Sequence, residues 1–157
     1  MTHHADDLLL VAPSTCYERL WNELAAVMIL KRGPPLGEGW ELFLGRWWRR
    51  QPDCWEVKLG ADYYNAIVEA LHRSDSGAVG SPHWGADADQ GELLDDEEHQ
   101  LFRMAVGKLA WSVGCRPDLC YPVKELARKL HAPRQVDMAH LKRVVRFVKG
   151  TPNAVLR

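Results

Sequence analysis

The chain has 157 residues, of which 46% are hydrophobic and 26% are charged, and its formal net charge is -1. This length suits one domain or a small pair of domains, and the apolar content excludes an intrinsically disordered chain. No apolar run approaches the roughly 20 residues of a membrane-spanning helix. The N-terminus also lacks the basic start and long apolar stretch of a signal peptide. We therefore expect an intracellular protein of the cytoplasm or nucleus, without a membrane partner.

The net charge hides two opposed halves of the chain. Residues 1–100 hold 8 Lys/Arg and 18 Asp/Glu, a charge of -10, whereas residues 101–157 hold 12 Lys/Arg and 3 Asp/Glu, a charge of +9. Such an asymmetry is typical of a basic surface for a polyanion beside an acidic region. Two ordinary faces that attract one another would give the same numbers.

A strand and a helix are predicted at the start of the chain. The carboxylates of Asp6-Asp7 run into an apolar segment, residues 8–12, that predicts a strand. A helix is predicted to begin at residue 14 or 15, because Thr15 and Glu18 have the spacing of a capping box. Its apolar residues recur at helical spacing, so we expect one face of this helix to pack on a sheet.

Two further strands are predicted before residue 60. Residues 40–49 and 54–59 are rich in aromatic or β-branched residues, and Arg50-Gln51-Pro52-Asp53 between them is typical of a hairpin turn. Residues 1–60 are therefore expected to form a short antiparallel sheet with one helix.

The second part of the chain, residues 61–157, has the pattern of a helical bundle. Helices are predicted over residues 62–72, 95–113, 118–131 and 134–149, with Asp62, Asp95 or Asp96, and Asp118 as N-caps and Gly150 as a C-terminal cap. Residues 73–95 are rich in Gly, Ser and Asp and predict a flexible linker. Strands first and helices second predict an α+β fold.

Asp6 and Asp7 are the one arrangement that suggests catalysis. Adjacent carboxylates on a tight turn beside a strand can hold divalent metal ions for phosphoryl transfer. Such a pair is also common as a solvated turn, and a two-metal centre normally needs a further carboxylate on a neighbouring strand. Five residues precede Asp6 in this sequence, and none of them is acidic.

A ridge of three residues is predicted on the helix that follows Asp96. Arg103, Gly107 and Trp111 are spaced i, i+4, i+8, beside a separate core stripe that includes Phe102 and Leu109. Arginine for phosphate, glycine for clearance and tryptophan for sugar or base packing would suit a nucleic-acid duplex. The alternative is a helix–helix contact at Gly107 with Trp111 buried as core.

The last predicted helix is amphipathic with a basic exposed side. Met138, Leu141, Val145 and Val148 share one face, and Lys142, Arg146 and Lys149 lie on another, with Arg143 alongside. A solvated helix usually mixes its charges, so this row favours contact with phosphates.

Together these segments resemble reverse transcriptases of copia-type LTR retrotransposons. His4-Ala5-Asp6-Asp7-Leu8-Leu9 is similar to the Tyr-X-Asp-Asp hairpin, and Phe43-Leu44-Gly45 looks like the strand that grips the primer end. The family's C-terminal signature is resembled, in order, by residues 101–111, Arg116-Pro117-Asp118 and residues 142–151.

The resemblance implies the C-terminal palm and thumb of an RNA-directed DNA polymerase from a Pol polyprotein, with the start of the connection. It implies that Asp6 and Asp7 bind the catalytic magnesium ions. It also implies that Arg103, Gly107 and Trp111 track the minor groove of a primer–template, either an RNA–DNA or a DNA duplex. The implied partners are this duplex and the missing half of the polymerase.

The sequence also departs from the family pattern. His4 and Ala5 replace the usual Tyr and Val, and the fingers and first half of the palm, with the other metal-binding Asp, are not among these 157 residues. We therefore expect that these residues alone do not extend a primer. The alternatives are a stand-alone protein-interaction module, which could self-associate through an apolar sheet face, and an inactive remnant of the transposon.

Overall fold

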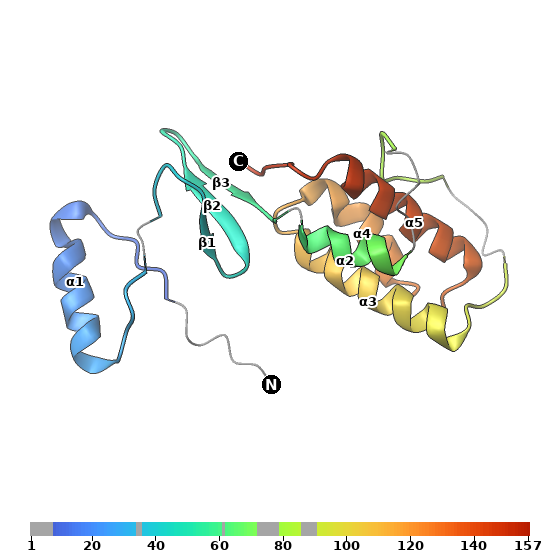
Figure 1. Ribbon diagram of the computed structural model, residues 1–157, viewed down its shortest axis with the longest axis horizontal. Coiled ribbons are helices and arrows are strands. Elements are labelled where there is room, and N and C mark those ends of the chain that lie inside the picture. The colour runs from blue at the N-terminus through green and yellow to red at the C-terminus, as the bar shows by residue number, and fades with distance from the viewer. Residues whose placement is uncertain (1–7, 34–35, 61, 72–78, 86–90) are drawn as a thin grey trace.

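Short aromatic strands in the first half of the chain and amphipathic helices in the second form an α+β fold, which confirms the predicted class (Figure 1). The computed structural model describes residues 8–33, 36–60, 62–71, 79–85 and 91–157, so Asp6 and Asp7 lie outside the described residues. The elements are, in chain order, α1 (Ser14–Val27), β1 (Glu41–Phe43), β2 (Arg46–Arg50), β3 (Trp55–Lys58), α2 (Asp62–Ala70), α3 (Asp96–Ser112), the 3-10 helix η1 (Pro117–Leu119), α4 (Cys120–Ala127) and α5 (Gln135–Gly150). Helices α2 to α5 gather at one end, α1 lies at the other, and the sheet lies between them.

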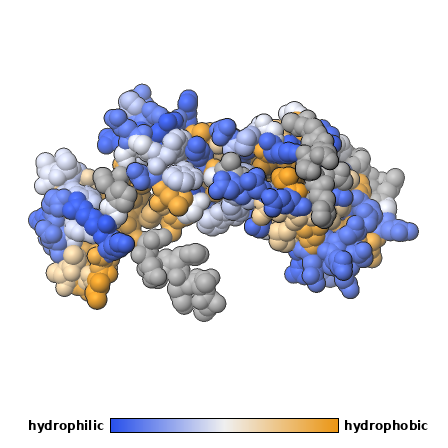
Figure 2. All heavy atoms as spheres, viewed as in Figure 1, coloured by the Kyte–Doolittle hydropathy of each residue, from blue (hydrophilic) through white to orange (hydrophobic). Residues whose placement is uncertain are grey.

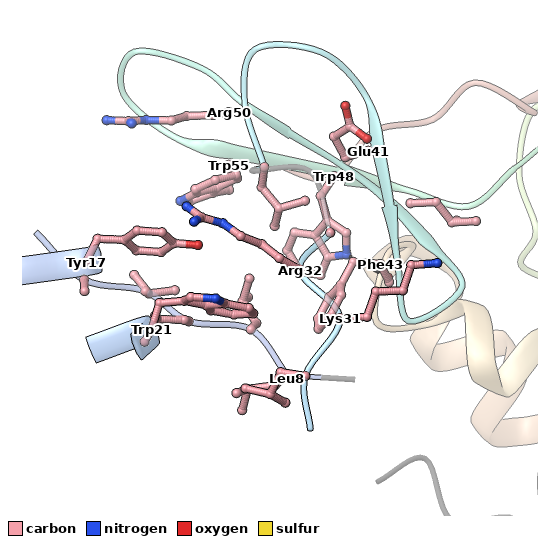
Figure 3. A pocket seen from close by; sticks show the side chains of 18 of the residues that line it. Leu8, Tyr17, Trp21, Lys31, Arg32, Glu41, Phe43, Trp48, Arg50 and Trp55 are labelled. Carbon is pink, nitrogen blue, oxygen red and sulfur yellow. Dashed lines mark hydrogen bonds between the residues drawn. The ribbon is translucent and has the colours of Figure 1, made fainter. Parts of the chain in front are cut away.

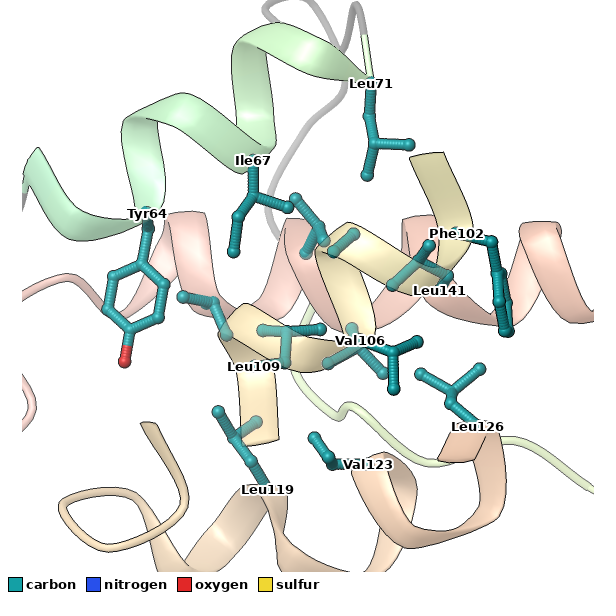
Figure 4. Packing of buried hydrophobic residues seen from close by; sticks show 14 of the residues in the cluster. Tyr64, Ile67, Leu71, Phe102, Val106, Leu109, Leu119, Val123, Leu126 and Leu141 are labelled. Atoms are coloured by element: carbon teal, nitrogen blue, oxygen red, sulfur yellow. The ribbon is translucent and has the colours of Figure 1, made fainter. Parts of the chain in front are cut away.

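The core lies among helices α2 to α5 and is built from the apolar stripes that the sequence predicts. On α3, Phe102 and Leu109 have no exposed surface and Val106 is 1% exposed. Around them pack buried side chains of the other helices: Tyr64, Ile67, Leu71, Leu119, Val123, Leu126, Met138, Leu141, Val144, Val145 and Val148 (Figure 4). Within the described ranges, no helix has the length and apolar character that a bilayer span requires.

The predicted helix ends are right for α3 and wrong for α4. Asp95 caps α3, because its side chain accepts a hydrogen bond of 2.8 Å from the backbone N–H of Glu98. Asp118 caps nothing: its carboxylate accepts hydrogen bonds from Arg116, and it lies within η1, one turn before α4. Helix α4 also ends at residue 127 rather than 131. Gly150 is the last residue of α5, and Thr151 is the C-cap.

The prediction of a strand over residues 8–12 is wrong. These residues form no helix or strand, and Leu8, Leu9 and Val11 are 50%, 48% and 81% exposed. A strand needs a partner for its backbone groups, and the described sheet contains only β1, β2 and β3. An apolar run alone was not enough to specify that partner.

Helix α1 forms where the sequence predicts it, but neither the capping box nor the packing on the sheet is present. Glu18 accepts two hydrogen bonds from Arg32, at 2.7 and 3.1 Å, and no side chain caps the helix. None of the residues of α1 is buried. The pairing with Arg32 replaces the predicted cap.

The predicted strand over residues 40–49 is in fact a hairpin. Strands β1 and β2 are antiparallel, with Phe43 opposite Arg46. Leu44 and Gly45 form the turn between them with φ of 50° and 70°, the positive values that a tight turn of this kind requires. Of the predicted strand Phe43-Leu44-Gly45, only Phe43 is therefore in a strand. The second hairpin, β2–β3, is confirmed, with its turn at residues 51–54.

The described parts of the predicted linker lie against α5. The ring of Trp84 stacks on that of His140, with centroids 4.4 Å apart. The backbone N–H of Leu94 donates to the carbonyl of Pro133 at 3.0 Å. These contacts hold residues near 84 and 94 on the helical bundle.

Glu56 on β3 fastens the end of the chain to the sheet. Its side chain is buried and accepts hydrogen bonds from Arg49, from Gln51 at 3.2 Å and from Arg157 at 2.7 Å. Val57 pairs with Leu156 in the same place. These hydrogen bonds, that from Arg49 above all, lower the pKa of Glu56 from 4.5 to about 2, although desolvation opposes them.

The pKa of Glu56 predicts an acid-dependent loss of stability. Because the folded pKa is depressed, the contribution of Glu56 is fully present above about pH 4.5 and is lost as the pH falls towards 2. In urea unfolding between pH 7 and pH 3, Glu56→Gln is expected to destabilise the protein at pH 7. It should also reduce the fall in unfolding free energy between pH 7 and pH 3, the acid limb of the stability curve. The control is Glu41→Gln on β1, which should leave the limb unchanged. An equally steep limb in Glu56→Gln would contradict this assignment.

Candidate nucleic-acid interface

Helix α3 presents the three predicted ridge residues on its exposed side. Arg103 and Gly107 are exposed, and 48% of the surface of Trp111 is exposed. A Cβ atom added at Gly107 would meet no heavy atom within 4 Å. The alternative of a helix–helix contact at Gly107 with Trp111 in the core is therefore wrong within the described chain. The open space at Gly107 would allow close approach by an external molecule.

Helix α5 confirms its predicted apolar face and carries the basic row beside it. Met138, Leu141 and Val148 are at most 2% exposed. Lys142, Arg143 and Arg146 are half-buried, and Lys149 is exposed. The Nε atoms of Arg143 and Arg146 are buried and have no hydrogen-bond partner. This is the arrangement of long cationic side chains that bury their stems and direct their charge outward.

Acidic side chains do not neutralise the main cations of these two helices. Among the described residues, no ion pair involves Arg103, Lys142 or Arg146. The arginines that do pair, such as Arg49 and Arg116, lie on other elements. Unpaired cations on neighbouring helices raise the local positive potential, which favours an anionic partner.

A residue that sequence reasoning missed, Arg46, joins the sheet to this ridge. Its guanidinium carbon lies 4.7 Å from the centroid of the Trp111 ring, within the range of a cation–π contact. Its Nη2 atom would lie 2.9 Å from a Cβ added at Gly114, so a larger residue there would make the end of the Arg46 side chain shift. No local sequence signal points to Arg46, because its partners lie far along the chain and the turn before it has the sequence pattern of a strand.

The surroundings of Arg46 include a half-buried tyrosine and a buried cysteine, and the pKa of each is raised. Burial raises the pKa of Tyr63 to about 12, with a further contribution from Tyr64, and the charge of Arg46 acts in the opposite direction. Burial likewise raises the pKa of the Cys115 thiol, again opposed by Arg46. The hydroxyl of Tyr63 donates to the carbonyl of Lys108 at 2.8 Å. Both groups are thus protonated at neutral pH and leave the charge of Arg46 uncompensated.

The primer-grip-like residues lie at the β1–β2 turn, next to Arg46. The carbonyl of Phe43 accepts a hydrogen bond from the indole nitrogen of Trp48 at 3.2 Å, and Leu44 is 42% exposed. The structure therefore brings Gly45 and Arg46 near the C-terminal end of α3. No described hydrogen bond joins the row on α5 to this cluster.

An apolar cavity lies between α1 and the sheet. It has a volume of about 710 Å³ and is lined by aromatic and aliphatic side chains, among them Tyr17, Trp21, Phe43, Trp48 and Trp55. Figure 3 shows these side chains facing one another across the space, with Arg32 and Lys31 beside them. Apolar surface is also visible at the α1 end of the molecule in Figure 2.

The described residues form no metal site. They contain no group of three or more His, Cys, Asp or Glu side chains that could hold a metal ion. The predicted ligands Asp6 and Asp7 lie outside the described ranges. The expectation of magnesium therefore rests on the sequence.

Comparison with known proteins relates parts of the chain to retrotransposons. The Retrovirus-related Pol polyprotein from transposon RE1 of Arabidopsis thaliana is 38% identical over 62 residues, which cover 40% of this chain and 4% of that protein. The corresponding polyprotein from transposon RE2 of Arabidopsis thaliana is 40% identical over 52 residues, or 33% of this chain and 4% of that protein. An uncharacterised mitochondrial protein of the same plant is 44% identical over 50 residues, covering 32% of this chain and 21% of that protein.

These partial matches support a retrotransposon Pol origin for the chain. It spans only a small part of the length of these polyproteins. No protein-family model matches the chain, and no solved structure matches it. The polymerase activity itself is taken up below as a proposal.

Proposed function

We propose that this chain is the duplex-binding part of a copia-type reverse transcriptase, an RNA-directed DNA polymerase, in which α3 and α5 contact the primer–template. The observation that carries the proposal is the exposed ridge of α3, where Arg103 and Trp111 flank a glycine with open space above it. The relation to Pol polyproteins supports this function over other uses of a basic helix.

The ridge has the chemistry that a duplex requires. An exposed arginine can bind phosphate oxygens, and an exposed indole can pack on sugars or bases. Between them, Gly107 has no Cβ to hold the backbone of the partner away. A helix that merely faced solvent would gain about 1 kcal/mol from alanine at this position.

The row on α5 is proposed to add phosphate contacts that are independent of sequence. Lys142 and Arg146 have no acidic partner in the described chain, and Lys149 stands at the exposed C-terminal end of the helix. Contacts of this kind release counterions. For each B-DNA phosphate that is contacted, log K therefore falls by roughly 0.9 for a tenfold rise in salt concentration.

Magnesium and the missing polymerase half belong to the same proposal. In a complete polymerase, Asp6 and Asp7 would hold the metal ions that stabilise the attacking and leaving oxygens. The proposed location of this protein is the cytoplasm or nucleus, where it would meet such a duplex. The described residues support the binding part of this proposal only.

The proposal predicts salt-dependent duplex binding that depends on the ridge. By fluorescence anisotropy with a labelled RNA–DNA hybrid, the chain is expected to bind, and log K should fall linearly with log salt. The double variant Arg103→Ala/Trp111→Ala is expected to weaken binding by about 100-fold, from one charged contact and one stacking contact. Lys142→Ala/Arg146→Ala should reduce the salt slope by roughly 1 to 2.

The matched control for the second pair is Lys31→Ala/Arg50→Ala. It removes the same charge from residues that line the cavity between α1 and the sheet, so the slope should stay near that of the unchanged protein. If both pairs lowered affinity equally, binding would follow net charge rather than the proposed surface. Unchanged binding in the ridge variant would remove α3 from the interface.

A second candidate function is that of a protein-interaction module. The observation in its favour is the apolar surface around the cavity: α1 has no buried residue, and Val27, Ile29 and Leu42 are 77%, 105% and 60% exposed. Apolar surface of this extent is typical of an interaction site. Self-association in sedimentation experiments, without nucleic acid and insensitive to salt, would favour this second function.

A further inference from the structure

The cavity between α1 and the sheet has aromatic side chains on both of these sides. Aromatic residues of α1 and of the sheet line it: Tyr17, Trp21, Phe43, Trp48 and Trp55 (Figure 3). Its volume of about 710 Å³ lies within the range of small-molecule pockets, roughly 300–1,000 Å³. Rings on both sides of a space favour a flat aromatic ligand, because aromatic rings gain from offset or edge-to-face contact beyond the area that they bury.

Arg32 reaches into this cavity from the segment after α1. Its guanidinium carbon lies 5.3 Å from the centroid of the Tyr17 ring and 5.6 Å from that of Trp21. Figure 3 shows the side chain between the rings of α1 and those of the sheet. Glu18 accepts one hydrogen bond from each terminal nitrogen of Arg32, at 3.1 and 2.7 Å. These contacts orient the guanidinium within the cavity.

The charges around the cavity favour an anion. A guanidinium carries more N–H groups than the two that Glu18 accepts, and 47% of the Arg32 side chain is exposed. Two further cations of the lining, Lys31 and Arg50, are exposed and form no ion pair in the part of the chain that the structure describes. Among the described residues of the lining, the one acid is Glu41. Cations in excess over acids attract a negatively charged ligand.

We propose that this cavity binds a small aromatic carboxylate, with its rings between α1 and the sheet and its carboxylate on the guanidinium of Arg32. The inference does not depend on duplex binding, which is proposed for α3 and α5. Arginine suits this role, because its planar N–H groups match a carboxylate while its face lies on aromatic rings. A cationic ligand would have to displace Arg32 and would be repelled by Lys31 and Arg50.

The first test compares probes of one shape and different charge on the unchanged protein. Pyrenebutyrate, the uncharged pyrenebutanol and the cationic pyrenebutylamine are titrated, and quenching of tryptophan fluorescence reports binding, because three indoles line the cavity. The carboxylate is expected to bind about 10-fold more tightly than the alcohol, the effect of one charged hydrogen-bond contact. Equal binding of these two probes would overturn the inference, and so would tightest binding of the amine.

Variants of Arg32 test where the carboxylate binds. Arg32→Gln is expected to bind pyrenebutyrate about 10-fold more weakly and pyrenebutanol as before, so that the two probes bind equally. Arg32→Lys should recover part of the difference, because an ammonium keeps the charge without the planar fork. Arg19→Gln is the matched control, because Arg19 is an exposed cation of α1 outside the lining. A full difference between the probes in Arg32→Gln would overturn the inference.

Variants of tryptophan test the aromatic sides of the cavity. Trp55→Ala should weaken both probes by a similar factor, and Trp111→Ala should weaken neither. The two indoles are 44% and 48% exposed, but only Trp55 lines the cavity. Calorimetry gives these affinities, and thermal melting shows whether each variant is folded. If folded Trp55→Ala keeps full affinity, the probes bind elsewhere and the inference is overturned. The comparison on the unchanged protein decides the case if a variant fails to fold.

The competing occupant of this cavity is a second copy of the chain. Sedimentation experiments with and without pyrenebutyrate separate the two. A monomer that binds the carboxylate more tightly than the alcohol supports the inference. A chain that self-associates and binds none of the three probes would have the cavity covered by the second copy, which would overturn it.

Discussion

Replacing Leu109 with alanine is expected to lower the free energy of unfolding by about 3 to 4 kcal/mol. Leu109 is completely buried at the centre of the stripe on α3, and α2, α4 and α5 all pack around this helix. The truncation removes apolar contacts and leaves a cavity that the surrounding helices can close only in part. This is among the largest effects that a single substitution should have on stability here.

Urea unfolding followed by far-UV circular dichroism measures this loss. The matched control is Leu42→Ala on β1, because Leu42 is 60% exposed and its truncation should cost no more than about 0.5 kcal/mol. A loss below 1 kcal/mol for Leu109→Ala would contradict the packing of α3 at the centre of the bundle.

The core of the bundle could be predicted because its signal is local and repeated. Phe102, Val106 and Leu109 recur at helical spacing along an element of 17 residues, and Asp95 marks its start. Each repeat of the pattern restricts the face that is buried, so the whole stripe is specified by α3 alone. The same holds for α5, whose apolar and basic faces were both predicted.

The structure of the N-terminal part was harder to predict. It depends on which segments pair with one another rather than on the spacing of apolar residues within one segment. Residues 8–12 are apolar enough for a strand but find no neighbour in the described sheet. The turn at Leu44 and Gly45 lies within an aromatic run that resembles one strand, and it places a leucine at positive φ where Asn or Gly is usual. Local pattern cannot resolve such competing alternatives.

Only the part of the candidate site that lies on α3 could be predicted from the sequence. The spacing of Arg103, Gly107 and Trp111 marks a ridge on any helix, and the structure exposes it. Arg46 reaches Trp111 from a different element, and contacts between elements leave no mark in the local sequence. Asp118 illustrates a related problem: its spacing suits a cap, but the neighbouring Arg116 binds its carboxylate.

Replacing that neighbour, Arg116, with alanine is expected to destabilise the protein by about 3 kcal/mol. Arg116 is 4% exposed, and it donates to Asp118 at 2.7 Å and to the carbonyl and hydroxyl oxygens of Thr151 at 3.0 and 2.9 Å. It therefore fastens the segment after α3 to the end of α5. The alanine variant leaves the acceptors on Thr151 without their donor and opens a cavity against Phe147.

Unfolding of Arg116→Ala, Asp118→Ala and the double variant measures this effect and its origin. The sum of the two single losses should exceed the loss in the double variant, because both substitutions remove the same ion pair. Arg116→Lys should recover only part of the stability, since one ammonium cannot reproduce two separate sets of hydrogen bonds. Additive losses would mean that Arg116 acts through Thr151 alone.

Comparison with Arg103 separates the two uses of arginine in this bundle. Arg103 is exposed and has no ion pair in the described chain, so Arg103→Ala should change stability by less than about 0.5 kcal/mol and weaken duplex binding. Arg116→Ala should do the reverse: at concentrations of denaturant where it stays folded, its duplex affinity should match that of the unchanged protein. An Arg116 variant that is stable but fails to bind would place this buried arginine in the interface and would contradict a division between structural and binding cations.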